Sequence, residues 1–493
     1  MKYLILFAIF GYAAFTGVAF YRRMVFDHFY KLAAKALILR QQAFNGEIFF
    51  SERVLKSVVR FLIKEHNPSA KRALLYLCFG KTSPAENYLK KHNKIFEAEI
   101  LNAFQNLSNA IPVIEKEVKK NPSRQEMTIE LAAMYFCRGN LPKARLALEN
   151  INPKKASRYV KAKYGYYQSF FNLANGDMLS ASENCSRAIK LFNRERAYYE
   201  EAKACQQMGT VYRISCVEDV AQFMFDAALK LNEKLGNRAG CADVCGNLGM
   251  LMVLQERFEE AAAYFEKAEK INEEIRRNSA LADIYNQQAL MLLLQKEYKT
   301  AARKLSLVSK TSSDKKSLAF GQELLAHVCY EQKSYKKAVK AAETAEELYK
   351  GSNLSAMLES MYLRALCLFE LKQFSEAEKL LRKIITVSRK NESSFHPANA
   401  YNLLGLIFLQ MKDLKRAKGL FLQSLSLEQK NDRLTGIATD YANISLIEYR
   451  CGNFDAAEKT LQTALEYAKA FGENELSKII EERLNKLKIQ LKQ

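Results

Sequence analysis

The sequence predicts an all-α protein built from repeated helical hairpins. A small residue near the end of one helix is followed twelve residues later by an alanine just after a short turn, and this spacing recurs nine times at steps of 37 to 40 residues. The chain has only 7 prolines and 19 glycines, which argues against long linkers. Because one hairpin cannot bury its own apolar face, such self-similarity is typical of a stack of repeats. The nine pairs are Ala132/Ala144, Ser169/Ala181, Gly209/Ala221, Gly249/Ala261, Ala289/Ala301, Ala326/Ala338, Ala365/Ala377, Gly405/Ala417 and Ser445/Ala457.

The segment GNLGMLMVLQERFEEAAAYFEKAEKI, residues 246–271, shows how one hairpin is expected to close. Gly249 costs about 1 kcal/mol relative to alanine inside a helix, so a contact outside that helix must compensate. We expect Gly249 on the first helix, with Ala261 and Ala268 on the second, to let the two backbones approach. Phe258 and Phe265 would fill the remaining space.

The turns between the paired helices also match one another. They read RGNLPKA, NGDMLSA, QERFEEA, QKEYKTA, QKSYKKA, LKQFSEA, MKDLKRA and CGNFDAA, and an aromatic residue or leucine usually stands three residues before the alanine. The repeat around Gly209 carries CVEDVA at this point, which predicts a departure from the common turn.

These residues resemble the tetratricopeptide repeat (TPR), whose signature is a small residue, an alanine after the turn and a further alanine on the second helix. The step near 40 residues is similar to the long-helix variant of kinesin light chains and bacterial peptide-sensing regulators. The resemblance covers residues 121–472, about 70% of the chain, although the sequence has no tryptophan and lacks the proline that often closes a repeat. It implies a right-handed superhelical solenoid whose first helices line a concave groove.

The amino-terminal segment predicts a membrane anchor. Tyr3 to Tyr21 is a stretch of nineteen residues without a charge, ended by Arg22 and Arg23. As a helix it would span about 28 Å, close to the hydrocarbon thickness of a bilayer. The fold class predicted for the whole chain is therefore a TPR solenoid preceded by one transmembrane helix. A cleaved signal peptide, with residues 17–19 as its cleavage site, is the alternative.

Charge and cysteine content predict the side of the membrane. The formal net charge is +21, and residues 22–120 carry 18 Lys and Arg against 9 Asp and Glu. The positive-inside rule then places the bulk of the chain in the cytoplasm. The 10 cysteines form no closely spaced disulfide framework, as expected in a reducing compartment. The basic residues either attract anionic lipid or only solvate helical faces.

Four segments follow from these patterns. Residues 24–120 include Ala73 and Ala85 at the same twelve-residue spacing, which is consistent with a degenerate repeat. The predicted segments are a transmembrane anchor at 1–23, a basic helical juxtamembrane region at 24–120, a TPR solenoid at 121–472 and a C-terminal capping helix at 473–493.

No motif indicates catalysis. The 5 histidines are widely separated, and the glycines of GNLG belong to the repeat rather than to a phosphate-binding loop. Cys241 and Cys245 share one helical face, but no further ligands complete a metal site, so we expect a packed pair of core cysteines. The prediction is a protein that is not an enzyme, with no metal and no cofactor. Nucleic-acid binding is not expected, because the net charge comes without a recognition motif or a dense basic stripe.

The remaining prediction is binding through the groove. Tyrosines offer broad anchoring surface, and asparagines can pair with a peptide backbone, although they can equally cap or solvate helices. A basic, tyrosine-bearing amino-terminal half favours an acidic or phosphorylated partner segment. The candidate groove residues are Lys163, Tyr166, Tyr167, Phe170, Lys203, Gln206, Gln207, Arg213, Asn247, Asn286, Gln287, Asn402 and Asn443.

The function predicted from these observations is a membrane-anchored scaffold that recruits partner proteins through its TPR groove. Two alternatives stay open at this point. One is an extracytoplasmic assembly factor of a membrane complex, and the other is a peptide-responsive regulator whose superhelix is compressed by its ligand.

Overall fold

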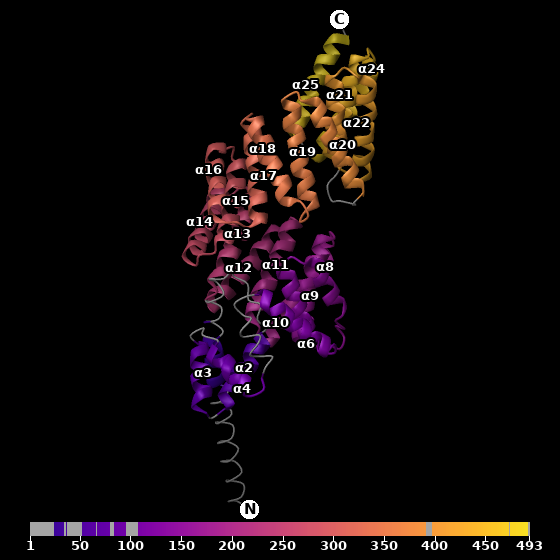
Figure 1. Cartoon of the computed structure of the whole chain (residues 1–493). Coiled ribbons are helices and arrows are strands. Elements are labelled where there is room, and N and C mark those ends of the chain that lie inside the picture. Colours follow the sequence, from indigo (N-terminus) through magenta and orange to yellow (C-terminus); the bar gives the residue numbers. More distant parts are fainter. Residues whose placement is uncertain are drawn as a thin grey trace, which may run out of the picture. The chain divides into compact units, whose positions relative to one another are not determined.

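The computed structural model describes residues 24–33, 36, 52–65, 67–78, 83–94, 107–390, 397–472 and 474–491. Within these ranges every regular element is a helix (Figure 1). The chain divides into two compact units, Met1–Gln287 (unit 1) and Gln288–Gln493 (unit 2).

The helices of unit 1 are α2 (Glu52–Lys64), α3 (Pro68–Cys78), α4 (Ser83–Lys91), α6 (Leu107–Lys120), α7 (Gln125–Cys137), α8 (Leu141–Glu149), α9 (Arg158–Ala174), α10 (Met178–Glu195), α11 (Tyr198–Ile214), α12 (Glu218–Leu235), α13 (Arg238–Leu254) and α14 (Phe258–Glu274). The unit boundary falls inside α15 (Asn278–Leu294). Unit 2 continues with α16 (Tyr298–Thr311), α17 (Lys315–Glu331), α18 (Tyr335–Tyr349), α19 (Leu354–Glu370), α20 (Phe374–Lys390), α21 (Ala398–Gln410), α22 (Leu414–Lys430), α23 (Leu434–Arg450), α24 (Phe454–Phe471) and α25 (Asn474–Leu491).

Each unit is a stack of helical hairpins. In unit 1 the pairs α7/α8, α9/α10, α11/α12 and α13/α14 pack together, and each of the first helices α7, α9 and α11 also touches the first helix of the next hairpin. Unit 2 repeats the arrangement in α17/α18, α19/α20, α21/α22 and α23/α24. The predicted all-α repeat solenoid is thus confirmed, while its right-handed sense stays a prediction.

The turn inside each hairpin has the same backbone conformation in all nine predicted repeats. The residue seven positions after the small residue has a positive φ, between 56° and 83°. The next N–H then bonds to a carbonyl five residues back, as Arg257 does to Met252 at 2.9 Å, which is the helix-ending Schellman geometry. The nine residues with positive φ are Gly139, Gly176, Cys216, Glu256, Lys296, Lys333, Lys372, Lys412 and Gly452.

The expected departure at CVEDVA is therefore wrong for the backbone. Cys216 has φ 57°, and the Val217 N–H bonds to the Tyr212 carbonyl at 2.9 Å, as in the other turns. The turn depends on backbone hydrogen bonds that most residues can make, so an atypical sequence still adopts it.

Gly249 is explained by a close contact with the second helix of its hairpin. A Cβ built on Gly249 would lie 2.5 to 2.9 Å from three ring carbons of Phe265, nearer than real Cβ atoms come. Ala261, Phe265 and Ala268 are all fully buried, as the sequence predicted. The glycine is needed because the aromatic ring occupies the position that a side chain would take.

The same pairing recurs with residues of matched size. Sixteen residues after the small residue, Phe225 and Phe421 pack on Gly209 and Gly405 as Phe265 does on Gly249. Where the small residue is alanine, the partner is a leucine or an alanine, as in Ala289 with Leu305. A larger residue on one helix is thus compensated by a smaller one on the other, which keeps the two helices close.

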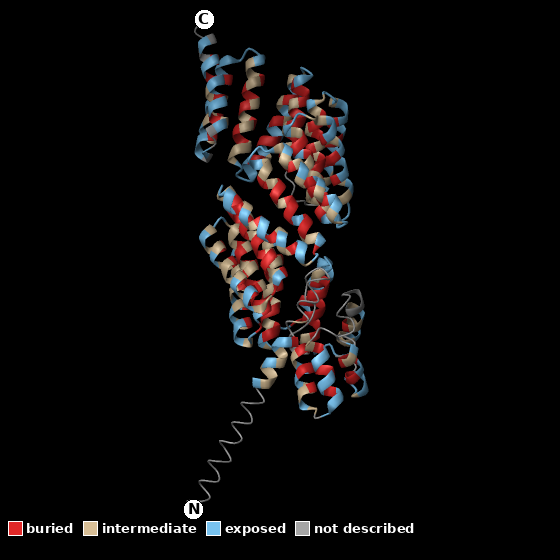
Figure 2. Cartoon of the chain, turned by 90° about the vertical axis from the view of Figure 1, so that its left-hand side faces the viewer, coloured by how far each residue is buried: buried red, intermediate tan, exposed pale blue. Residues whose placement is uncertain are grey.

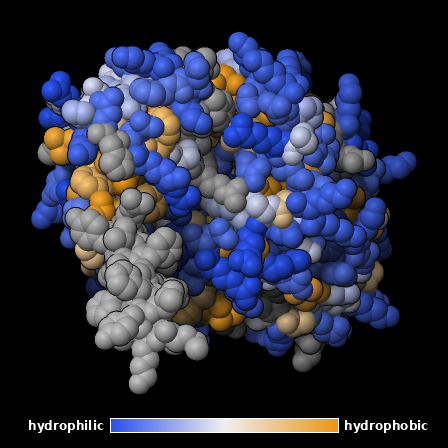
Figure 3. All heavy atoms as spheres, turned by 90° about the horizontal axis from the view of Figure 1, so that it is seen from below, coloured by the Kyte–Doolittle hydropathy of each residue, from blue (hydrophilic) through white to orange (hydrophobic). Residues whose placement is uncertain are grey.

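Burial follows the hairpin interiors. Figure 2 shows the buried residues as stripes along the helices, with exposed residues on the outer sides. In Figure 3 hydrophilic residues predominate over the face in view, and hydrophobic ones form only small groups there. The apolar residues therefore serve mainly to pack helix on helix.

The prediction of a single-pass membrane protein is corrected by the structure. Among the described residues, no helix is both long enough and apolar enough to cross a membrane. The stretch from residue 3 to residue 21, on which the prediction of an anchor rested, lies outside the described residues. The predicted membrane localisation and lipid partner are unsupported.

The ends of the repeat array are also helical. Ala73 on α3 and Ala85 on α4 are buried, and these two helices pack together. At the other end, α25 packs on α24 and buries Ile480 and Leu484. The degenerate repeat, the capping role of residues 473–493 and the four segment boundaries stay predictions.

The size-matched pairing predicts the outcome of a double-mutant cycle in unit 2. Gly405→Ala should destabilise the protein by about 1–3 kcal/mol, since the new Cβ would overlap the Phe421 ring. In Gly405→Ala/Phe421→Leu, which recreates the Ala–Leu pair, the loss should be smaller than the sum of the two single losses. Urea unfolding followed by circular dichroism measures all three variants.

Gly419→Ala is the matched control for this cycle. Gly419 lies on α22, two residues before Phe421, and a Cβ there would meet nothing within 4 Å. It should gain up to about 1 kcal/mol from helix propensity. If Gly405→Ala were equally stabilising, the ring contact would not be the reason for the glycine.

Candidate partner-binding face

The best candidate surface in unit 1 is one stripe of the first helices. It consists of the residues three before, one after and four after the small residue, which share a side of the helix. On α9 and α11 these positions are half-buried, so they are neither core nor fully solvated. We call this stripe, with Phe136 at the corresponding position of α7, the first-helix face of unit 1; its members are Phe136, Tyr166, Phe170, Leu173, Gln206, Thr210 and Arg213.

An aromatic cluster forms the α7 and α9 part of this face. The Phe136 ring centroid lies 4.7 Å from that of Phe170, and the Tyr166 centroid lies 5.2 Å from that of Phe170. Tyr167 packs behind them, 5.3 Å from Phe136, and burial raises its pKa well above the usual value. Phe136, Tyr166 and Phe170 therefore offer a continuous, partly exposed aromatic surface, whereas Tyr167 belongs to the core. Phe136 was missed at the sequence level, although it occupies the same register position as Arg213.

Lys163 forms an ion pair inside the protein. Its Nζ donates to both Glu130 carboxylate oxygens at 2.8 and 2.7 Å, and the two side chains are only 9% and 6% exposed. Close by, the Tyr159 hydroxyl donates to Glu200 at 2.9 Å. Burial raises the pKa of Glu200, while the Lys163 charge lowers it. These four groups join α7, α9 and α11, so a partner would have to compete with Glu130 for the ammonium group.

The four predicted residues on α11 differ in how available they are. Lys203 is half-buried, with its Nζ 5.2 Å from the Tyr199 ring centroid. Gln206 is half-buried on the first-helix face, as is Arg213. Gln207 is 5% exposed, and its buried Nε2 has no hydrogen-bond partner. Gln206 and Arg213 are thus the α11 side chains best placed to meet a ligand.

The asparagines are less available than the sequence suggested. Asn247 on α13 is half-buried, but Asn286 on α15 is only 1% exposed. Gln287 is half-buried, and its Oε1 would lie 3.1 Å from a Cβ built on Gly246. A peptide could reach Asn286 only if neighbouring side chains moved. The part that these residues play in binding stays a prediction.

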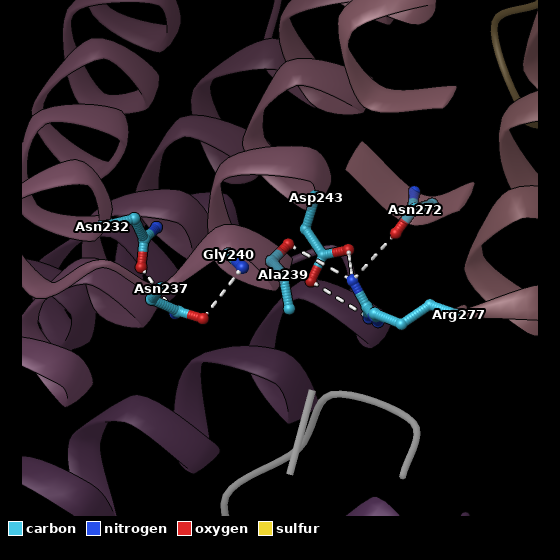
Figure 4. Close-up of polar contacts among 7 residues, drawn as sticks. All are labelled: Asn232, Asn237, Ala239, Gly240, Asp243, Asn272 and Arg277. Carbon is cyan, nitrogen blue, oxygen red and sulfur yellow. Dashed lines mark hydrogen bonds and ion pairs between the residues drawn. The ribbon is translucent and has the colours of Figure 1, made fainter. Parts of the chain in front are cut away.

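A polar junction between successive hairpins was not foreseen. Arg277, which precedes α15, donates to Asp243 on α13 at 2.8 Å and to the Ala239 carbonyl at 3.2 Å (Figure 4). One repeat earlier, Asn237 donates to the buried Asn232 and accepts from the Gly240 N–H. The signal was present in the sequence, since Asn232 and Asn237 stand forty residues before Asn272 and Arg277.

Comparisons with known proteins agree with this geometry. Residues 242–275 and 356–430 each match a family model described as tetratricopeptide repeat. The chain contains tetratricopeptide repeats. The two matches coincide with hairpin α13/α14 and with hairpins α19/α20 and α21/α22.

The solved structures that are similar to this chain include the following two. The apo form of the quorum sensor NprR from B. thuringiensis is 12% identical, covers 72% of this chain and 99% of its own, and gives a TM-score of 0.51. A signal transduction ATPase with a tetratricopeptide repeat sensor, from Pyrococcus horikoshii, is 12% identical, covers 91% of this chain and 65% of its own, and gives a TM-score of 0.50. At this identity the likeness shows the fold alone. No curated protein matches the sequence.

Most cysteines of the repeats are buried, whereas Cys216 and Cys451 are exposed. Cys241 and Cys245 are both buried with free thiols, and burial raises the pKa of each, to about 11 for Cys241. The described part of the chain contains no group of three or more His, Cys, Asp and Glu that could hold a metal ion.

In unit 2 the predicted Asn402 is bonded to a buried carboxylate. Its Nδ2 donates to Asp440 Oδ1 at 2.5 Å, and Asp440 is 1% exposed with no partner for its other oxygen. Burial raises the pKa of Asp440 to about 7, and the charge of Glu428 acts in the same direction, against the lowering effect of the hydrogen bond from Asn402. Asn443 is half-buried on the same helix, α23. Asn402 therefore holds two TPR hairpins together and is not free for a partner.

Asp440 gives a pH-dependent prediction. Because the pKa of Asp440 is higher in the folded than in the unfolded chain, this carboxyl group favours the folded state at low pH. This contribution to the free energy of unfolding is lost as the pH rises from about 4 to about 7. Asp440→Asn should therefore increase the free energy of unfolding at pH 8 by roughly 2 kcal/mol, with the gain shrinking towards pH 4.5. Urea unfolding at both pH values measures it.

Glu466→Gln, at an exposed position of α24, serves as the control for removal of a carboxylate charge. Its effect should be small and should change little with pH. An Asp440→Asn gain that was the same at pH 4.5 and pH 8 would contradict the raised pKa.

Proposed function

We propose that this chain is a protein-interaction protein that captures a segment of a partner on the first-helix face of unit 1. The observation that carries the proposal is the partly exposed aromatic surface in which the Phe170 ring centroid lies 4.7 Å from that of Phe136 and 5.2 Å from that of Tyr166. Aromatic side chains supply large contact area at low cost in conformational entropy, and they are enriched among the residues that dominate binding energy. The TPR fold supports the same role.

We propose that the protein recruits its partners without catalysing a reaction. The residues of the first-helix face carry aromatic, aliphatic, amide, hydroxyl and guanidinium groups, which bind and orient a partner. The chain would then act by bringing partners together, and we do not assign it an enzymatic activity.

A peptide-responsive regulator is the second candidate. It is favoured by the likeness to the fold of a protein described as a quorum sensor, over 99% of that protein's length. In this case a short peptide would occupy the face and change the superhelix. Small-angle scattering with and without the peptides that copurify with the protein would reveal such a change.

The test of partner capture is in-cell crosslinking followed by purification and mass spectrometry. The amount of each partner retained by Tyr166→Ala/Phe170→Ala should be at least ten-fold lower than that retained by the native chain. Truncation of one anchoring side chain typically costs about 1 to 2 kcal/mol or more of binding free energy, and about 1.4 kcal/mol corresponds to ten-fold in affinity. Circular dichroism should show unchanged helicity in the variant.

Phe223→Ala is the matched control, because Phe223 is an aromatic residue on the second helix α12 and is 67% exposed. It should retain the partners. Loss of partners in Phe223→Ala but not in Tyr166→Ala/Phe170→Ala would move binding to the second helices and overturn the proposal.

A further inference from the structure

Among the residues that the structure describes, no carboxylate is paired with Arg213. Arg213 lies in the last turn of α11, half-buried on the first-helix face, and its Nε is buried with no hydrogen-bond partner. Burial alone lowers its pKa, and no neighbouring carboxylate opposes that effect. A guanidinium group held in this way is destabilising for the free protein, since a partly buried charge normally needs a partner.

The other half-buried or buried arginines with described contacts do have such partners. Arg277 is paired with Asp243 at 2.8 Å. Arg364 is paired with Glu343 at 3.1 Å and with Glu346 at 3.0 Å. Glu218 and Asp219 begin α12 just after Arg213, but neither carboxylate acts on the guanidinium. The position of Arg213 is therefore unusual within this protein.

The surroundings of Arg213 fit an anionic group on a peptide. Gln206 precedes it by seven residues on the same stripe of α11 and carries an amide donor, whereas the Thr210 hydroxyl donates to the Gln206 carbonyl at 3.1 Å. The neighbouring first helix α9, which packs on α11, contributes the rings of Tyr166 and Phe170. A segment with one acidic group beside an apolar side chain would match this combination.

We propose that Arg213 is the anion-binding residue of the first-helix face and that the captured segment presents a carboxylate or a phosphate to it. Guanidinium binds both groups with two parallel hydrogen bonds, so both sources share the same chemistry. This inference rests on the proposed function, since it names the chemistry of the partner that the same face captures.

The first test observes Arg213 directly in the full-length protein labelled with ¹⁵N-arginine. The Arg213 Nε–Hε signal is assigned as the one missing from the spectrum of Arg213→Met, which replaces the guanidinium by an apolar side chain of similar length. Sodium phosphate and sodium acetate are then titrated separately at constant ionic strength, with sodium chloride as the reference. Should Arg213→Met misfold, Arg213→Lys gives the same assignment.

The expected result is a saturable shift of the Arg213 signal that exceeds the shifts of the other arginines. A shift with phosphate alone favours a phosphorylated partner, and a shift with acetate as well favours an acidic one. Arg187, an exposed residue paired with Glu183 on α10, is the internal control. An Arg213 signal that moved no more than that of Arg187 with either anion would overturn the proposal.

The second test uses the partners retained in the crosslinking experiment. When these partners are captured from a cell extract, Arg213→Met should reduce capture at least ten-fold while Arg187→Met does not. Phosphatase treatment of the extract before this capture separates phosphate from carboxylate. Undiminished capture by Arg213→Met overturns the anion site but leaves the proposed function standing. If Tyr166→Ala/Phe170→Ala captures normally while the Arg213 signal still responds to anions, the proposed function fails and the anion site stands.

Discussion

The close approach of two helices at one small residue is the contact on which the rest of the structure depends. At Gly209, Gly249 and Gly405 an aromatic ring from the second helix occupies the space where a Cβ would stand. This contact fixes both the distance between the paired helices and the rotation of the first helix about its axis. Since the rotation is shared by successive hairpins of a unit, residues at one register position form a common stripe. The candidate binding face is a consequence of this rotation, not of a loop or a special turn.

Between hairpins, polar contacts replace apolar ones at one recurring position. The second helix ends in a buried Asn232, Asn272 or Glu428, and the residue five positions later, Asn237, Arg277 or Arg433, meets it. Buried polar groups add little net stability when they are satisfied, but they penalise any other register of packing. The junctions thus help to set how one hairpin follows the next. Arg213 stands out against them because it has no partner of this kind.

The sequence indicated the neighbourhood of the candidate site better than its individual members. Tyr166, Phe170, Gln206 and Arg213 lie partly exposed on the first-helix face, as the register suggested. Lys163 and Asn402, at equally plausible positions, are taken up by Glu130 and Asp440. Helical spacing places a side chain on a stripe, but whether that stripe is open depends on the length and polarity of what the neighbouring helix presents. The sequence alone does not show which side chains the neighbouring helix presents to the stripe.

The sequence by itself determined the hairpins, because the signals involved are local. A small residue, a turn seven residues later and a packing partner sixteen residues later lie within one hairpin, so their spacing is readable along the chain. Only the tertiary structure decided which polar groups are paired, since Lys163 with Glu130, Asn402 with Asp440 and Tyr159 with Glu200 are 33, 38 and 41 residues apart. Such pairs form between different hairpins, where a small change in helix packing moves a side chain past its partner. That no carboxylate in the described part of the chain pairs with Arg213 is likewise visible only once the neighbouring helices are in place.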